Sequence, residues 1–91
     1  KIGHLLNWLE AGNGASDPWV HNHLMFRIAG VAKGAQLQRF LNYFATLVND
    51  AERFWVLQPI EDKAALEQLR FWLQQYPESQ ELQQLIKKLS A

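Results

Sequence analysis

The chain has 91 residues, no cysteine, and nine basic residues that balance nine acidic ones. Its apolar fraction of 48% is enough for a packed core, which excludes a wholly disordered chain. The lack of cysteine excludes disulfides, thiol nucleophiles, iron–sulfur clusters and cysteine-based zinc sites. No apolar run approaches the roughly 20 residues of a membrane span. Zero net charge argues against a dedicated nucleic-acid binder.

The length predicts a single small domain spanning residues 1–91. The chain begins with Lys1 and shows no signal-peptide pattern, so we interpret it as a piece of a larger protein with the cytoplasm as its default compartment. The run Ala11–Ser16 contains two glycines, an asparagine and a serine. This composition predicts a flexible connector at residues 11–16.

Apolar residues recur at helical spacing in five segments. The predicted helices span residues 2–10, 18–31, 35–49, 61–76 and 79–89. Asp17 and Pro18 give the second helix a start signal, because aspartate caps free amides and proline suits the first helical position. Pro77 ends the fourth helix. The pattern therefore predicts a compact, mainly α domain of four to five helices.

Two short apolar segments are ambiguous between helix and strand. Residues 25–29 can continue the second helix or form a strand, and residues 54–58 contain aromatic and β-branched side chains that favour a strand. If both segments are strands, the helix at 35–49 joins them in a right-handed βαβ unit. The alternative fold is therefore α+β, with a two-stranded element at 25–29 and 54–58.

Candidate catalytic and metal-binding groups are few. His21 and His23 lie two residues apart, so on a helix their side chains point away from each other and do not readily share one metal. Glu61 and Asp62 are adjacent carboxylates, but a helix start explains them without acid–base chemistry. No serine lies in a nucleophile motif. We therefore predict a non-enzymatic chain without catalytic, cofactor-binding or metal-binding residues and without a small-molecule substrate.

Four tryptophans are many for a chain of this length. Trp55 and Trp72 lie in segments that we expect to be buried. Trp8 and Trp19 flank the predicted connector, and the simplest expectation is that they pack onto the domain. The alternative is an exposed binding patch, because tryptophan is enriched at interface hot spots.

The apolar face of the last predicted helix is the other candidate interaction surface. Its members are Leu82, Leu85, Ile86 and Leu89. A terminal helix often docks on its own core, and the alternative is that it pairs with a protein partner or a second copy. Together with Trp8 and Trp19, this face makes up the predicted interaction surface.

A small basic patch is a third possibility. Arg27, Lys33 and Arg39 would form this patch near aromatic residues. Because the chain has no net positive charge, nucleic-acid binding ranks behind protein binding.

From about Phe26 onward, the order of features resembles the N-terminal cytosolic domain of bacterial rhomboid intramembrane proteases. The similar pieces are Phe26-Arg27-Ile28, Leu37-Gln38-Arg39-Phe40-Leu41-Asn42-Tyr43, Phe54-Trp55-Val56-Leu57 and Trp72-Leu73-Gln74-Gln75-Tyr76-Pro77-Glu78. The resemblance implies a small α+β accessory domain that precedes the membrane protease. It places the catalytic serine and histidine outside this chain, so no functional residue carries over.

We expect a non-catalytic protein-interaction or regulatory domain of a larger protein. It would bind a protein partner or associate with itself, and it would need no cofactor. The alternatives are the cytosolic accessory domain of a rhomboid-type membrane protease and a small nucleic-acid-binding domain.

Overall fold

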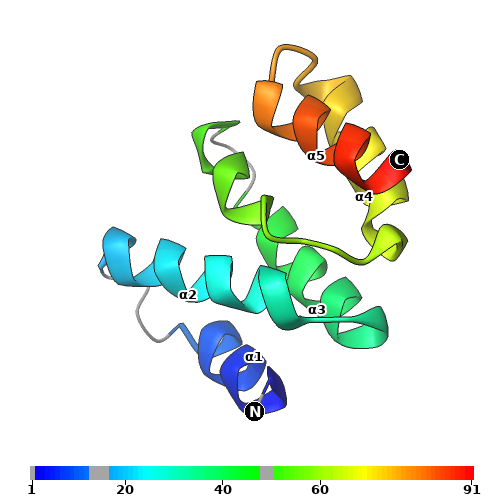
Figure 1. The fold of residues 1–91 in the computed structure, drawn as a ribbon. Helices are drawn as coiled ribbons and strands as arrows, with labels where there is room; N and C mark the ends of the chain where they lie inside the picture. The colour runs from blue at the N-terminus through cyan, green and yellow to red at the C-terminus, as the bar shows by residue number, and fades with distance from the viewer. Residues whose placement is uncertain (1, 13–16, 48–50) are drawn as a thin grey trace.

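The computed structural model describes residues 2–12, 17–47 and 51–91, and this part of the chain is mainly helical (Figure 1). Its elements are α1 (Ile2–Glu10), α2 (Pro18–Val31), α3 (Gly34–Ala45), η1 (Ala51–Leu57), η2 (Lys63–Ala65), α4 (Leu66–Gln75) and α5 (Gln80–Ser90), where η denotes a 3-10 helix. The prediction of a mainly α domain with four to five helices is confirmed.

α2 runs without a break through residues 25–29, the first ambiguous segment. Its start is set by Asp17, whose carboxylate accepts hydrogen bonds from the backbone N–H groups of Trp19 and Val20 at 3.1 and 3.4 Å. The segment therefore extends a helix that has already started, and adding residues to a helix costs less free energy than nucleating a new element. The strand predicted as the alternative at 25–29 is wrong.

The second ambiguous segment forms η1 and not a strand. The backbone N–H of Gln58 donates to the carbonyl of Trp55 at 3.2 Å, and that of Ile60 donates to the carbonyl of Leu57 at 3.0 Å. The run thus satisfies its backbone groups locally, whereas an extended segment needs a neighbouring strand. The described residues contain no strand, so the α+β alternative is wrong for this part of the chain.

The ends of three predicted elements differ from the structure in detail. Of the predicted connector at 11–16, Ala11 and Gly12 form a turn, while residues 13–16 lie outside the described residues. The helix predicted at 35–49 corresponds to α3, which ends at Ala45, and residues 48–50 are again outside the described part. The helix predicted at 61–76 begins as the 3-10 turn η2 before α4 takes over.

One hydrophobic core lies among the helices, and a cluster of aromatic rings lies within it. The ring of Phe44 on α3 contacts the rings of Phe40, Phe54 and Trp72, with centroid distances of 6.3, 6.0 and 5.5 Å. Phe54 also meets Tyr76 edge-on at 5.3 Å. The cluster thereby connects α3, η1 and α4 through direct contacts, which are individually worth about 0.5–1.5 kcal/mol beyond their buried area.

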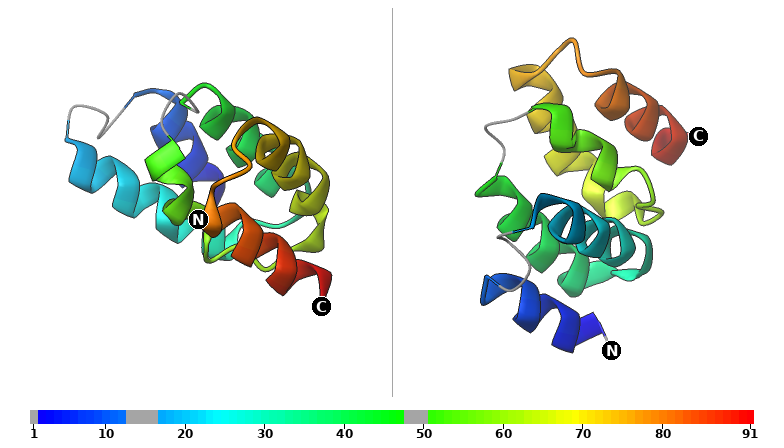
Figure 2. Two further views of the ribbon diagram at one scale, coloured as in Figure 1. Left: turned by 90° about the horizontal axis from the view of Figure 1, so that it is seen from above. Right: turned by 90° about the vertical axis from the view of Figure 1, so that its left-hand side faces the viewer.

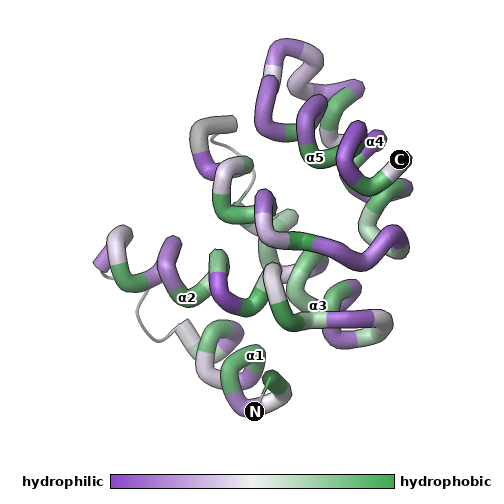
Figure 3. The backbone as a smooth tube through the Cα atoms, in the orientation of Figure 1, coloured by the Kyte–Doolittle hydropathy of each residue, from purple (hydrophilic) through white to green (hydrophobic). Residues whose placement is uncertain are grey.

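The chain folds into two parts that meet at η1. α1, α2 and α3 form the first part, while α4 and α5 pack side by side as the second (Figures 1 and 2). η1 packs along α2 on one side and against α5 on the other. Apolar and polar residues alternate along the helices in Figure 3, as expected for helices with one buried face.

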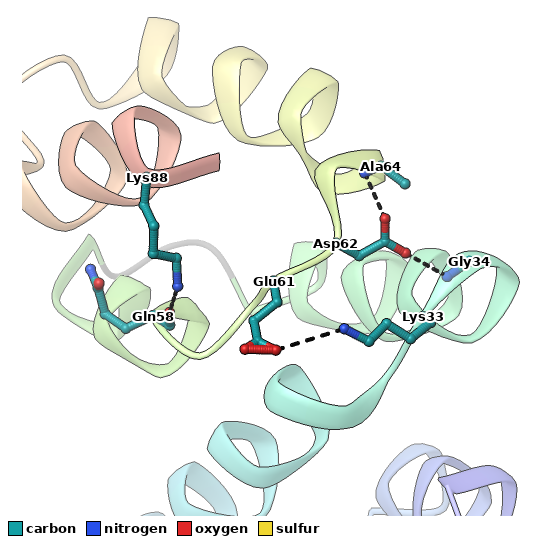
Figure 4. Close-up of polar contacts among 7 residues, drawn as sticks. All are labelled: Lys33, Gly34, Gln58, Glu61, Asp62, Ala64 and Lys88. Carbon is teal, nitrogen blue, oxygen red and sulfur yellow. Dashed lines mark hydrogen bonds and ion pairs between the residues drawn. The ribbon is translucent and has the colours of Figure 1, made fainter. Parts of the chain in front are cut away.

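Asp62 joins the two parts by capping two helices at once (Figure 4). One of its carboxylate oxygens accepts from the backbone N–H of Gly34 at 2.8 Å, at the start of α3, and the other accepts from Ala64 at 3.0 Å, in η2. These two hydrogen bonds hold the pKa of Asp62 below its usual value. Beside them, Lys33 and Glu61 form an exposed ion pair at 3.9 Å.

Gln58 connects the end of η1 to α5 in a similar way (Figure 4). Its side-chain amide donates to the backbone carbonyl of Glu81 at 3.0 Å. The backbone carbonyl of Gln58 also accepts a hydrogen bond from the ammonium group of Lys88 at 2.8 Å. Because Glu81 and Lys88 lie two turns apart, the contact aligns η1 along α5.

Candidate interaction surface

The outer face of α2 carries aromatic side chains. Trp19, His23 and Phe26 share this face because they are spaced at i, i+4 and i+7. Trp19 is 73% exposed and Phe26 is 37% exposed. The opposite face holds the four buried residues of the helix, His21, Met25, Ile28 and Ala29. α2 therefore presents an aromatic face to solvent while its other face is used for packing.

η1 extends this aromatic face with Trp55, which is 41% exposed. The rings of Phe26 and Trp55 lie 5.7 Å apart, and the ring of Trp19 stacks on that of His23 at 5.1 Å with an interplanar angle of 11°. We call these four residues, Trp19, His23, Phe26 and Trp55, the aromatic stripe. With 1.5 Å of rise per residue, it covers roughly 10 Å along α2 between Trp19 and Phe26.

Charged residues of both signs belong to the segments that carry the stripe. α2 carries no carboxylate side chain, and its one permanent charge is Arg27, which follows Phe26 and is exposed. Arg27 forms no ion pair with any described residue. On η1, the partly buried Arg53 precedes Trp55 by two residues. Acidic residues lie beside the stripe as well, because Asp17 directly precedes α2 and Glu52 precedes Arg53 in η1.

His21 lies on the buried side of α2 and is 3% exposed. Its Nε2 atom lies 2.9 Å from the hydroxyl oxygen of Tyr43 on α3. Burial lowers the pKa of His21, and the positive charge of Arg53 lowers it further. Burial raises the pKa of Tyr43, against a smaller opposing effect of Arg53. The pair is therefore neutral at pH 7. Its histidine is buried where α2 packs on α3, and its tyrosine is partly buried.

The four tryptophans divide differently from the prediction. Trp72 is 3% exposed, as predicted, but Trp55 is an exposed residue and not a core one. Three residues per turn place Phe54 and Leu57 on one buried side of η1 and turn Trp55 outward. Trp8 on α1 is 45% exposed, so neither it nor Trp19 follows the simpler expectation of packing onto the domain.

The predicted apolar face at 82–89 lies inside the domain. Leu82, Leu85 and Leu89 are at most 3% exposed, and Ile86 is partly buried against the same core. Ser79 caps this helix by accepting from the backbone N–H of Leu82 at 3.2 Å. α5 thus docks on its own core, and its three leucines are occupied by α4 and η1.

Two of the three cations of the predicted basic patch are paired with carboxylates. Arg39 is bound by the carboxylate of Glu10 at 2.7 and 2.8 Å, and Lys33 pairs with Glu61. The hydrogen bond from Arg39 lowers the pKa of Glu10. Of these three cations, Arg27 has no ion pair with a carboxylate whose side chain the structure describes.

The described residues form neither a metal site nor a membrane-spanning helix. His21 points inward and His23 outward, as expected for residues two apart on a helix. Among the described residues, no three histidine, aspartate or glutamate side chains lie close enough to hold a metal ion. No helix in residues 2–12, 17–47 or 51–91 has the length and apolar character to cross a membrane.

A further exposed aromatic residue lies away from the stripe. Phe71 on α4 is 53% exposed and borders a shallow groove that it shares with Gln38, Ala64, Glu67 and Gln68. It makes no ring contact with another described residue, unlike the rings of the stripe. Phe71 therefore offers a matched control for experiments on the stripe.

No protein-family model, curated protein or solved structure matches this chain. The resemblance to the N-terminal domain of rhomboid proteases stays a prediction, and the α+β fold that it implies is not the fold of the described residues. The exposed surface is therefore the feature of this chain that bears on its function. Sequence reasoning found Trp19 but missed His23, Phe26 and Trp55. His23 and Phe26 could have been found from the sequence, because they follow Trp19 at the i+4 and i+7 positions of the same helix.

Proposed function

We propose that this chain is a non-catalytic protein-interaction domain whose aromatic stripe contacts a protein partner. The observation that carries the proposal is Trp19, which is 73% exposed while its ring is stacked on His23. A tryptophan in this setting offers a large apolar area to a partner. Its orientation is already restricted, so less side-chain entropy is lost on binding.

The second pair of rings supports the same proposal. Phe26 and Trp55 come from different elements, yet they meet on the same exposed face. Aromatic residues that cluster on a surface and are bordered by arginine are typical of interface hot spots. Burial of a large apolar side chain is worth about 1.5–3 kcal/mol, so two such anchors would supply a useful share of a binding energy.

The alternatives have less support from the described residues. His21 is buried between α2 and α3 and hydrogen-bonded to Tyr43, which disfavours an enzyme that uses this histidine. Phosphate binding needs several available cations, whereas Lys33 and Arg39 are both paired with carboxylates. We therefore rank protein binding first.

Site-specific crosslinking tests the proposal in cells of the source organism. The photoreactive residue p-benzoylphenylalanine is placed at position 23, within the stripe, or at position 71 as the control. We expect a covalent adduct with a distinct protein from position 23 and not from position 71. The adduct should be lost in Trp19→Ala and retained in Phe71→Ala, since only the first removes an anchor.

Two results would contradict the proposal. One is an adduct from position 23 that Trp19→Ala leaves unchanged, because the anchor would then play no part. The other is equal labelling from positions 23 and 71, which would indicate random collisions. Trp19 is largely exposed, so Trp19→Ala should change the stability by less than about 0.5 kcal/mol. Circular dichroism checks that the variant is folded.

A further inference from the structure

We infer that two copies of this chain associate through the exposed face of α4, with the Phe71 ring of each copy in a groove of the other. The inference is independent of the proposed function, because α4 carries none of the residues of the aromatic stripe. It follows from three features of this face: an exposed aromatic ring, a groove beside the ring, and an acid and a base one helical turn apart.

The exposed face of α4 carries both a projecting ring and a hollow. Phe71 is 53% exposed, so much of its ring lies in water. The shallow groove beside it has a volume of about 440 Å³ and is lined by Gln38, Ala64, Glu67, Gln68 and Phe71 itself. Sites of this volume hold whole ligand molecules, so a single phenyl ring fits. One surface of the chain therefore presents a knob and a hole together.

The same face offers one negative and one positive charge. Glu67 and Arg70 are the charged residues of α4, and both are exposed. Neither forms an ion pair with a described residue, and every residue of η2 and α4 is described. One turn before Glu67, Lys63 donates to the backbone carbonyl of Ala91 at 3.4 Å. α4 thus has a carboxylate and a guanidinium group that a partner can engage.

Antiparallel pairing of two α4 helices brings these charges together. If the twofold axis passes between residues 68 and 69, residue 67 of one copy lies level with residue 70 of the other. Glu67 then meets Arg70 of the second copy, and the symmetry repeats this pair. The helix is therefore complementary in charge to a second copy of itself.

The same register places each aromatic ring at a groove. Phe71 of the second copy lies level with Leu66, between Ala64 and Gln68 along the helix. Ala64 and Gln68 line the groove, and they share the face of Phe71 through their i, i+4 and i+7 spacing. The register that pairs the charges is thus also the one that fills both grooves.

This double match favours a second copy over another protein. An unrelated partner would need its own ring, acid and base in the same arrangement, whereas a second copy supplies them by symmetry. Lys63 lies level with Gln74 of the second copy, so the register adds no further charge to the contact. Because a single pair of helices buries little area, we expect a weak dimer that depends on concentration.

Sedimentation equilibrium at increasing protein concentration tests the dimer. We expect the parent chain to show a monomer–dimer equilibrium at concentrations up to about 1 mM. Phe71→Ala should weaken association by about tenfold or more, because it empties both grooves at once. Trp19→Ala should leave association unchanged, since the stripe lies on other elements. Circular dichroism checks that both variants are folded.

Charge reversal provides the sharpest readout. Glu67→Arg alone and Arg70→Glu alone should each weaken the dimer by about fivefold or more, because each places like charges opposite each other twice. A mixture of these two variants should associate as the parent does, since every pair between them joins an acid and a base. The double variant Glu67→Arg/Arg70→Glu should dimerise on its own.

Three outcomes would overturn the inference. They are a chain that stays monomeric up to about 1 mM, a dimer that Phe71→Ala leaves unchanged, and mixed charge variants that associate no better than either alone. A dimer that Trp19→Ala abolishes would instead place the contact on the aromatic stripe. Position 71 remains a control in the crosslinking experiment, because an adduct formed there would join two copies of this chain and be recognised by its mass. The two proposals can therefore fail separately.

Discussion

At the scale of single residues, two histidines on one helix have opposite surroundings. His23 is exposed and supports the ring of Trp19, while His21 is buried and bonded to Tyr43. The difference follows from helix geometry, since residues two apart point about 200° apart around the axis. The adjacent residue Asn22 has a buried side-chain oxygen without a hydrogen-bond partner among the described residues, for which the structure offers no physical account.

We expect the buried histidine to make the domain less stable in mild acid. The pKa of His21 lies below its ordinary value of about 6.5, so the unfolded chain binds this proton more readily than the folded one. The contribution of neutral His21 to the free energy of unfolding is complete above about pH 7. It is lost progressively as the pH falls below 6.5 towards the lowered pKa. Urea unfolding between pH 8 and 5 measures the free energy of unfolding directly.

The matched variants for this measurement are His21→Gln and His23→Gln. His21→Gln removes the titrating group from the contact with Tyr43 and Arg53, so the fall in stability between pH 7 and 5 should become much shallower. His23→Gln should leave the fall unchanged. The interpretation is wrong if both variants lose stability with pH as steeply as the parent.

At the scale of elements, the helix ends show how distant parts of the chain cooperate. α2 and α5 are capped by the preceding residues Asp17 and Ser79, which are local signals. α3 has no such cap, because Lys33 precedes it, and Asp62 supplies the hydrogen bond from 28 residues away. The φ of +57° at Gly34 adds a conformation that other residues adopt at a cost.

Removing the shared cap should therefore cost more than removing its charged neighbour. Asp62→Ala should lower the melting temperature clearly, because it leaves the N–H groups of Gly34 and Ala64 without this acceptor. Glu61→Ala removes only an exposed ion pair with Lys33 and should change it little. Amide exchange at Gly34 should accelerate in Asp62→Ala alone. Similar losses in the two variants would rule out the shared cap.

At the scale of the whole molecule, the aromatic cluster holds the two parts together. Phe44 on α3 contacts both Phe54 of η1 and Trp72 of α4. A chain of this size buries a modest share of its surface and has a small free energy of unfolding. The loss of a central contact therefore destabilises the whole domain. The two parts should therefore unfold as one unit, although they are distinct in the ribbon (Figure 2).

We expect Phe44→Ala to destabilise the domain by about 3–5 kcal/mol, as large-to-small changes in a core do. Because this can exceed the stability of a small domain, Phe44→Leu serves as the milder variant with a smaller loss. In Phe44→Leu, amide exchange should accelerate in α1–α3 and in α4–α5 to the same extent. Protection retained in α4–α5 alone would mean that the parts unfold separately.

Much of the fold can be predicted from local sequence. The ranges 2–10 and 18–31 match α1 and α2, and the range 79–89 lies within one residue of α5 at both ends. Apolar spacing and capping residues act within a few positions of the chain, so they can be read without knowledge of the neighbours. The ambiguous segment at 54–58 was the exception, because a short apolar run fits several backbone conformations.

The exposure of each apolar residue depends on tertiary packing. Leu85 and Phe26 are both apolar residues on amphipathic helices, yet Leu85 is 1% exposed and Phe26 is 37% exposed. α5 packs against α4 and η1, while on the outer face of α2 the exposed ring of Phe26 meets that of Trp55. Burial is a property of the neighbours that a side chain meets, and these come from distant parts of the sequence. The helices therefore follow from the sequence itself, and the aromatic stripe emerges only from their arrangement.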